Sequence, residues 1–349
     1  MFTTVNIQRY QDHIATVKGR LSIDYNNLFV SLCGIRCRVN WYVNRNDCLI
    51  IPANYRFPVD LKSDSIYEHI LIALKNRRHT YIWGPSGCGK DSLVHAYCYL
   101  TKTPSYIFTI RPREDIQSWF FIRNFSKDGA FWEEGLLLKM IRDGYKCEDG
   151  TIIPYLILIS DFDRADKDQA EALRLVLDSI KGRVKGPQGV TYDILPGTCF
   201  VFTGNNPGAG DMTGKYISSN PVDSSLLDRI ERKFKFTWMS WEDERSVLLE
   251  SFPYLFKEVP NLINDVKSVV RKIRSAIETE ELFADFSIRS VKSWLGHAED
   301  LLRETGNPKN LLARAMRAWS DGLPDDDSVQ LQLLRYLEPL LKGINITGT

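Results

Sequence analysis

The sequence predicts an α/β fold, in which a mostly parallel sheet carries helices on both faces. Two observations lead to this prediction. Short apolar runs alternate with stretches of helical spacing between residues 80 and 203, and a glycine-rich turn at 84–90 joins one such run to a helix. Strand–helix alternation of this kind is typical of parallel sheets covered on both faces. We place a small β-rich N-terminal region at residues 1–62, the α/β domain at 63–240 and a helical lid domain at 241–349.

The individual elements follow from composition and spacing. Three runs rich in strand-forming residues lie in the N-terminal region, at 21–25, 28–33 and 37–43. The predicted strands of the α/β domain are 80–83, 106–110, 155–159, 198–203 and 233–238, and its predicted helices are 65–75, 92–100 and 169–180. The last domain has apolar residues at three- and four-residue steps, for example at 266–277 and 329–344, which predicts helices.

The composition is that of a globular protein, with 44% hydrophobic and 26% charged residues among 349. The formal net charge of +1 gives no indication of a nucleic acid or membrane partner. We find no apolar run near the ~20 residues of a membrane span and no signal-peptide pattern. Seven cysteines at irregular spacing do not suggest a disulfide framework, so we expect a cytoplasmic location.

The strongest motif is a glycine-rich loop between a predicted strand and a predicted helix. Glycines let successive backbone N–H groups point at a phosphate, and the helix N-terminus adds a favourable dipole. The lysine that ends the loop brings positive charge to the terminal phosphates. This context matches the Walker A pattern. We therefore expect ATP to bind at Gly84, Pro85, Ser86, Gly87, Cys88, Gly89, Lys90, Asp91 and Ser92.

A second motif is an apolar strand that ends in acidic residues, at 156–163. In the Walker B layout one carboxylate holds the metal and the next polarises water. An acidic turn after a buried strand is common by itself, so the signal depends on its distance behind the glycine-rich loop. The residues at issue are Ser160, Asp161 and Asp163.

Three further polar residues follow in a suggestive order. Asn205 comes after the strand at 198–203, where an amide can hydrogen-bond an attacking water, and Asn206 is its nearest competitor. Arg229 precedes a strand-like run, where an arginine can reach a neighbouring subunit's nucleotide, and Arg232 is the alternative. Arg289 lies in the helical domain.

These motifs together resemble the AAA+ superfamily of P-loop ATPases, in detail the MoxR group, and most of all the ATPase subunit of cobaltochelatase. The resemblance covers roughly residues 50–295. It is carried by Gly84-Pro85-Ser86-Gly87-Cys88-Gly89-Lys90, by Ser160-Asp161-Phe162-Asp163 where that family usually reads Asp-Glu-Tyr-Asp, by Thr203-Gly204-Asn205, by the segment 208–216, by Leu227-Asp228-Arg229 and by Ser287-Ile288-Arg289.

The resemblance implies roles for particular residues. Asn205 is expected to be sensor 1, Arg229 the arginine finger and Arg289 sensor 2. The segment 181–193 is expected to be a hairpin, and because it carries few apolar residues we expect it to be exposed and mobile. The family typically forms hexameric rings that bind ATP and Mg²⁺, and its members often work with a partner that carries a von Willebrand factor A domain.

The chain departs from the family at two matched positions. A Ser or Thr normally follows the Walker A lysine and offers Mg²⁺ a hydroxyl, but here the residue is Asp91. Aligned on Asp163, the Walker B aspartate falls on Ser160 and the catalytic glutamate on Asp161. The hydroxyl and the carboxylate have thus exchanged places. We predict Asp91 and Ser160 as the metal ligands and Asp161 as the water-activating base, with Asp163 as its substitute.

Three functions are consistent with this sequence. The leading hypothesis is a Mg²⁺-dependent ATPase that forms a ring and remodels a protein partner. A second is a nucleotide-dependent binding module with little turnover, which the replacement of glutamate by Asp161 favours. A third is a nucleic-acid motor or loader, supported only by Lys181, Arg183 and Lys185 in the expected hairpin.

Overall fold

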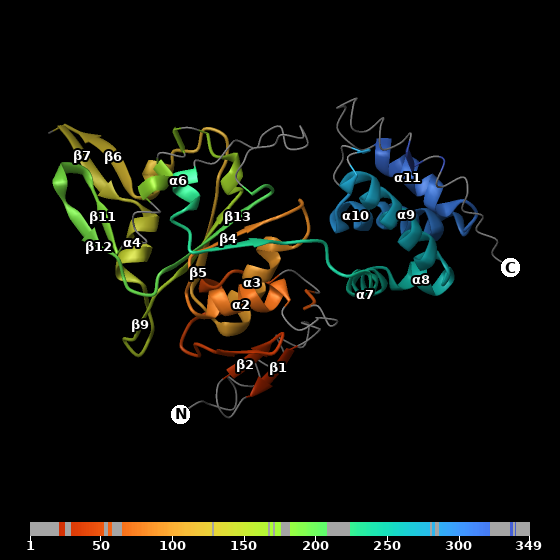
Figure 1. Cartoon of the computed structure of the whole chain (residues 1–349), viewed down its shortest axis with the longest axis horizontal. Helices are drawn as coiled ribbons and strands as arrows, with labels where there is room; N and C mark the ends of the chain where they lie inside the picture. Colours follow the sequence, from red (N-terminus) through yellow and green to blue (C-terminus); the bar gives the residue numbers. More distant parts are fainter. Residues whose placement is uncertain are drawn as a thin grey trace. The chain divides into compact units, whose positions relative to one another are not determined.

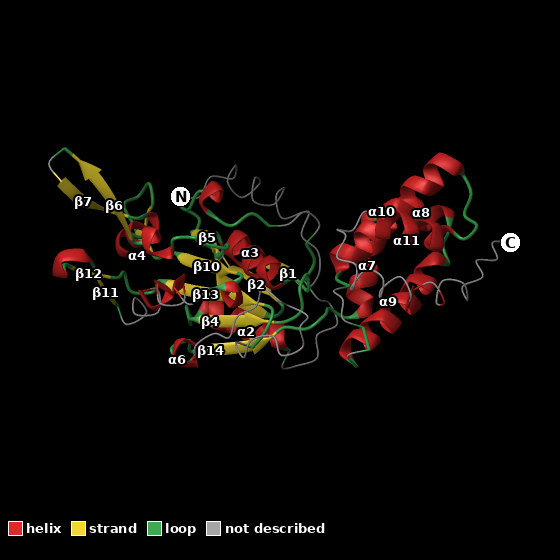
Figure 2. Cartoon of the chain, turned by 90° about the horizontal axis from the view of Figure 1, so that it is seen from above, coloured by secondary structure: helices red, strands yellow, loops and turns green. Residues whose placement is uncertain are grey.

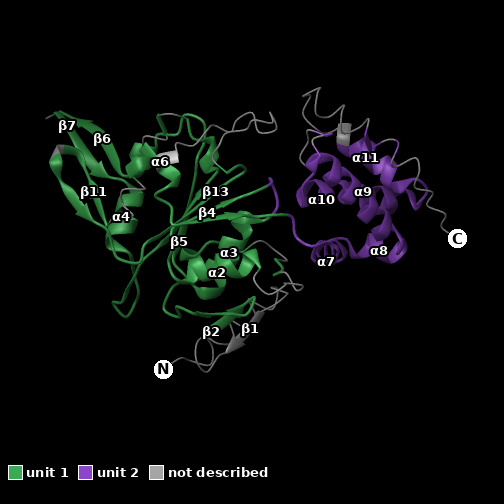
Figure 3. Cartoon of the chain, viewed as in Figure 1, with its two compact units in different colours: residues 1–84, 89–237 green, residues 85–88, 238–349 purple. Residues whose placement is uncertain are grey.

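The computed structural model describes most of the chain as two compact units. The described residues are 21–24, 29–51, 55–57, 65–127, 129–166, 168–169, 172–175, 182–207, 224–279, 281–282, 286–321, 336–337 and 339. Unit 1 comprises residues 1–84 and 89–237, and unit 2 comprises 85–88 and 238–349 (Figure 3). The division into domains at 1–62, 63–240 and 241–349 remains a prediction.

The core of unit 1 is a parallel sheet in the order β14-β4-β13-β10-β5 (Figures 1 and 2). Its strands are β4 (Thr80–Trp83), β5 (Ser105–Thr109), β10 (Leu156–Ser160), β13 (Cys199–Gly204) and β14 (Arg232–Lys235). Every residue of β10 and of β13 is buried. Continuous apolar runs of this kind are expected of central parallel strands, because both of their faces are covered.

Two helices lie together on one face of this sheet, α2 (Ile66–Lys75) and α3 (Lys90–Thr101) (Figure 1). The Ser65 side chain caps α2 by accepting a hydrogen bond from the Glu68 N–H. The N-terminal strands β1 (Leu21–Asp24), β2 (Phe29–Leu32) and β3 (Ile35–Arg38) form an antiparallel sheet, in which β2 contacts α3 and β3 contacts α2. The predicted α/β class and the N-terminal strands are confirmed.

Antiparallel hairpins project from unit 1, and the sequence predicted only one of them. The predicted hairpin consists of β11 (Arg183–Lys185) and β12 (Thr191–Asp193). The others are β6 (Phe121–Ser126) with β7 (Gly129–Glu134), and β8 (Tyr145–Lys146) with β9 (Ile152–Ile153). Between them lies the helix α4 (Leu136–Asp143). The strands β6 and β7 were not predicted, because their exposed aromatic residues and mixed polarity break the alternation of apolar and polar residues that marks a half-buried strand.

Most described residues of the hairpin at 183–193 are exposed, as expected, but one of its side chains is buried. Val184 is 1% exposed and belongs to the core of unit 1, and the ring of Tyr192 lies 5.7 Å from that of Phe121 on β6. The two hairpins lie side by side (Figure 1). Even a short, largely exposed strand can bury its one apolar residue against a neighbouring hairpin, and the expected mobility of this hairpin stays a prediction.

The described part of unit 2 after residue 240 is mainly helical, with α7 (Trp241–Ser251), α8 (Pro253–Glu258), α9 (Leu262–Glu278), α10 (Ile288–Thr305) and α11 (Leu311–Asp321). Trp294 and Phe286 lie fully buried in its core. The guanidinium of Arg274 binds the Glu244 carboxylate through two hydrogen bonds of 2.7 Å. Most of the predicted helix at 329–344 lies outside the described residues. Within the described part of the chain, no helix has the length and apolar character to span a membrane.

Candidate nucleotide-binding site

The candidate site lies at the carboxyl edge of the parallel sheet. Because all the described strands of this sheet run in the same direction, the segments that follow them meet at one edge. The glycine-rich loop follows β4, Asp161 follows β10 and Asn205 follows β13. The structure thus brings together three segments that are far apart in the sequence.

Backbone contacts anchor the first residue of the glycine-rich loop. The Gly84 N–H donates a hydrogen bond to the Gly204 carbonyl over 3.2 Å. A Cβ atom on Gly84 would overlap the Phe236 carbonyl oxygen, so only glycine fits there. The loop ends at Gly89, the N-cap of α3, which has a left-handed conformation with φ 101°. Residues 85–88 group with unit 2 by their contacts.

Lys90 connects the loop to Asn205. Its ammonium donates hydrogen bonds to the Gly84 carbonyl at 2.8 Å and to Asn205 Oδ1 at 3.2 Å. The side chain is only 8% exposed. The cation and the amide expected beside the terminal phosphate are therefore neighbours in the structure.

Asp91 and Ser160 are in direct contact. The Ser160 hydroxyl donates to Asp91 Oδ2 over 3.1 Å, from the last residue of β10 to the first turn of α3. Ser160 is 7% exposed. The other oxygen, Asp91 Oδ1, is buried and has no hydrogen-bond partner among the described residues. Ser92 follows in α3 with a half-buried side chain.

Asp161 has an unusual backbone for a residue with a side chain, at φ 58° and ψ 37°. This left-handed conformation is costly for most side chains but is tolerated best by Asn and Asp. Burial raises the pKa of the Asp161 carboxyl, Arg164 opposes that rise, and the negative charges of Asp91 and Asp163 add to it. Arg164 lies 3.7 Å from the carboxylate. A partly exposed carboxyl with a raised pKa suits a group that must accept a proton.

Asp163 is fully buried, unlike Asp161 two residues earlier. Its Oδ2 accepts hydrogen bonds from the Asn205 backbone N–H at 2.8 Å and from Asn206 Nδ2 at 3.2 Å. The Asn206 side chain thus binds Asp163, whereas the Asn205 side chain binds Lys90.

The structure places the predicted arginines on other elements. Arg229 occupies the turn after the short helix α6 (Ser224–Leu227), with a half-buried side chain. Arg232 begins β14 and is exposed. Arg289 lies in the first turn of α10 in unit 2 and is exposed. The segment 208–216 and Lys181 fall outside the described residues.

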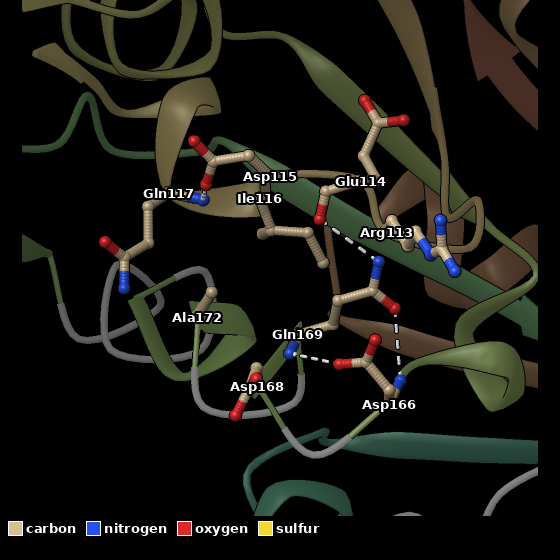
Figure 4. Close-up of a pocket in the computed structure, with 9 residues that line it drawn as sticks. All are labelled: Arg113, Glu114, Asp115, Ile116, Gln117, Asp166, Asp168, Gln169 and Ala172. Carbon is tan, nitrogen blue, oxygen red and sulfur yellow. Dashed lines mark hydrogen bonds between the residues drawn. The ribbon is translucent and has the colours of Figure 1, made fainter.

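A pocket of about 360 Å³ that the sequence did not suggest opens after β5 and β10 (Figure 4). Gln169 and Asp166 bond reciprocally: the Gln169 N–H donates to Asp166 Oδ1, and the Asp166 N–H donates to Gln169 Oε1. The Asp-x-x-Gln spacing is a capping signal at the start of the helix predicted at 169–180. The pocket is lined by Arg113, Glu114, Asp115, Ile116, Gln117, Asp166, Asp168, Gln169 and Ala172.

The geometry defines the class of this domain. A glycine-rich loop between a parallel strand and a helix, with its lysine beside an amide from a neighbouring strand, is the arrangement of a P-loop nucleotide-binding domain. Residues 79–230 match the family model of the AAA domain, dynein-related subfamily. This part of the chain is therefore similar to AAA domains, and the predicted P-loop fold class is confirmed.

Solved structures similar to this chain have low identity to it. A candidate ATPase from Cytophaga hutchinsonii is 14% identical, with a TM-score of 0.36, over 81% of this chain and 90% of that one. A lysine-to-arginine mutant of RuvB from Thermotoga maritima is 12% identical, with a TM-score of 0.47, over 80% and 78%. The RuvB Holliday junction branch migration motor of Thermotoga maritima is 11% identical, with a TM-score of 0.45, over the same shares. No curated protein matches the sequence.

Proposed function

We propose that this chain binds ATP at residues 84–92 and hydrolyses it as a ring-forming motor of the MoxR type that remodels a protein partner. The observation that carries the proposal is the contact between Lys90 and Asn205 at the carboxyl edge of an AAA domain. The Walker A lysine and the amide that orients water must flank one γ-phosphate, and here they are 3.2 Å apart.

The pair Asp91 and Ser160 fits a magnesium ion. Mg²⁺ takes oxygen ligands at 2.0–2.1 Å in an octahedral shell, so two adjacent ligands are about 3 Å apart. The Ser160 Oγ to Asp91 Oδ2 distance is 3.1 Å, and Asp91 has a buried oxygen without a partner among the described residues. A bound Mg²⁺ would neutralise charge on the phosphates. This fit supports an exchange of the hydroxyl and the carboxylate. The alternative is a site that has lost metal binding and in which Asp91 only repels phosphate.

Asp161 is the proposed base that takes a proton from the attacking water, and Asn205 orients that water. Asp161 remains partly exposed at the site edge, whereas Asp163 is fully buried and accepts hydrogen bonds from the loop at 205–206. Asp163 is therefore less suited than Asp161 to take that proton. The low-turnover binding module remains the second candidate, because Asp161 is one methylene shorter than the usual glutamate and has a left-handed backbone.

A ring arrangement would give Arg229 a role as a finger on the neighbouring subunit's nucleotide, with Arg289 as sensor 2. The partner proposed for the ring is a protein with a von Willebrand factor A domain. A nucleic-acid motor has less support. Arg183 is paired with Asp193 at 2.8 Å across the hairpin, which leaves less free positive charge there.

Mixing two inactive variants tests the function and the ring together. Lys90→Ala should abolish ATP binding, and Arg229→Ala should preserve binding but lower turnover by about 10³-fold or more. In a 1:1 mixture about a quarter of the subunit interfaces would pair an intact Lys90 site with an intact Arg229, so turnover should return to about that fraction. Arg232→Ala tests the alternative finger and should retain turnover if Arg229 is the finger.

Two results would contradict the proposal. A wild-type protein that binds ATP but turns it over no faster than Lys90→Ala would support the low-turnover binding module. Turnover close to that of the wild type in both Arg229→Ala and Arg232→Ala would contradict an arginine finger, and with it this argument for a ring.

A further inference from the structure

The base of the site contains a buried polar network that the proposed reaction does not use directly. Asp163 and Tyr81 are both 0% exposed. Neither can touch a nucleotide without a rearrangement of the core. A buried carboxylate is costly unless it accepts hydrogen bonds, so its retention there calls for a physical explanation.

The network holds the loop after β13 from two sides. From the turn that follows β10, Asp163 Oδ2 accepts the Asn205 N–H at 2.8 Å and Asn206 Nδ2 at 3.2 Å. From β4, the Tyr81 hydroxyl donates to the Asn206 carbonyl at 2.5 Å. The peptide group before Asn205 and the peptide group after Asn206 are thus constrained by side chains from β4 and from the turn after β10.

Gly204 makes this close approach possible. A Cβ atom at that position would lie 2.5 Å from the Tyr81 hydroxyl and 3.0 Å from Asp163 Oδ1. Burial raises the pKa of the Tyr81 phenol, and the nearby Asp163 raises it further. The phenol therefore stays protonated, and remains a hydrogen-bond donor, throughout the physiological pH range.

We propose that Asp163 and Tyr81 are positioning residues that hold the Asn205 backbone so that its side chain stays beside Lys90. The inference rests on the proposed function, in which Asn205 orients the attacking water. Asn205 Oδ1 lies 3.2 Å from Lys90 Nζ, and a displacement of about 1 Å at a reacting group can cost about 100-fold in rate. The two buried side chains act on the reaction only through Asn205.

The test compares Tyr81→Phe, which removes one hydroxyl, with Tyr97→Phe as control. Tyr97 is similarly buried, in α3. Tyr81→Phe should lower kcat by about 10-fold or more while KM and the Kd for ATP stay within about 2-fold, because the phosphate-binding loop is unchanged. Tyr97→Phe should leave kcat unchanged. Asp163→Asn retains a carbonyl oxygen as acceptor and should keep more activity than Asp163→Ala.

A double variant separates positioning from a general structural role. If the two residues act through Asn205, then Tyr81→Phe combined with Asn205→Ala should be no slower than Asn205→Ala alone. The inference would be overturned if the loss of kcat in the double variant equalled the product of the losses in the two single variants. Equal values of kcat for Tyr81→Phe and Tyr97→Phe would also overturn it.

Hydrogen exchange supplies a measurement that does not depend on turnover. The backbone N–H of Asn205 donates a hydrogen bond to Asp163. Its hydrogen exchange should therefore be faster in Tyr81→Phe and Asp163→Asn but not in Tyr97→Phe. A wild-type protein without ATPase activity would defeat the proposed function, and this exchange would then decide the inference alone. Unchanged exchange would show that the network does not hold the loop.

Discussion

The contact between Asp91 and Ser160 leads to the most discriminating prediction, an exchange of the two side chains. Ser160→Asp alone would place two carboxylates where one now lies 3.1 Å from a hydroxyl. Two unit charges at that distance repel by about 1 kcal/mol in water and about 5 kcal/mol at an effective dielectric constant of 20. Without metal, Ser160→Asp should therefore lower the free energy of unfolding by about 1–5 kcal/mol, and Mg²⁺ should recover part of that loss.

The other single variant, Asp91→Ser, should affect Mg-ATP binding more than the stability of the apo protein. Asp91→Ser removes the carboxylate closest to Ser160, together with a buried oxygen that has no partner among the described residues. The apo protein should lose little stability, but Mg-ATP should bind more weakly. The double variant restores one hydroxyl and one carboxylate in the usual places. It should bind Mg-ATP better than either single variant, with a coupling of about 0.5–3 kcal/mol, or about 2- to 100-fold in Kd.

The assay is a nucleotide titration in Mg²⁺ and in a chelator, with thermal unfolding of each variant alongside. Asp91→Ser should lose the advantage of Mg-ATP over metal-free ATP, and its affinity for metal-free ATP should be equal or higher. If Asp91 only repels phosphate in a decayed site, Asp91→Ser would bind both forms more tightly. That result, or strictly additive losses in the cycle, would refute the exchange.

Three other predictions concern single positions. Asp161→Asn should abolish most turnover. At pH values above the raised pKa of this carboxyl, the same variant should have a higher free energy of unfolding than the wild type, because the folded state disfavours the charged form. In the wild type, turnover should fall as the pH decreases through that pKa. Arg274→Met should cost about 3–5 kcal/mol by chemical denaturation, since it leaves Glu244 buried and unpaired, and adding Glu244→Leu should recover most of the loss. Gly84→Ala should destabilise by about 3 kcal/mol, because its Cβ would overlap a backbone carbonyl, whereas Gly296→Ala in α10 should be neutral or slightly stabilising.

Much of the fold followed from local pattern. The buried strands β10 and β13 are continuous apolar runs, which the sequence displays directly. The glycine-rich loop was identified by its own residues and by the strand and helix beside it. The hairpin β6–β7 was not predicted from the sequence. Its apolar residues do not form one buried face, and Phe125, for example, is 74% exposed. Periodicity predicts structure only where one face of an element is buried.

The sequence by itself determined that a phosphate-binding loop, acidic residues after one strand and an amide after another would share the edge of a parallel sheet. These are properties of short segments and of strand direction. Only the tertiary structure decided the burial and the contacts of each side chain, which differ even between residues of the same type that are close in sequence. Asp161 is partly exposed and Asp163 is buried two residues later, because the left-handed backbone of Asp161 turns the chain there. Likewise Asp91 meets Ser160 across 69 residues, and Tyr81, an ordinary aromatic residue of a strand, proves to hold the loop of Asn205. Side-chain environment depends on neighbours that are distant in sequence, and no local pattern encodes them.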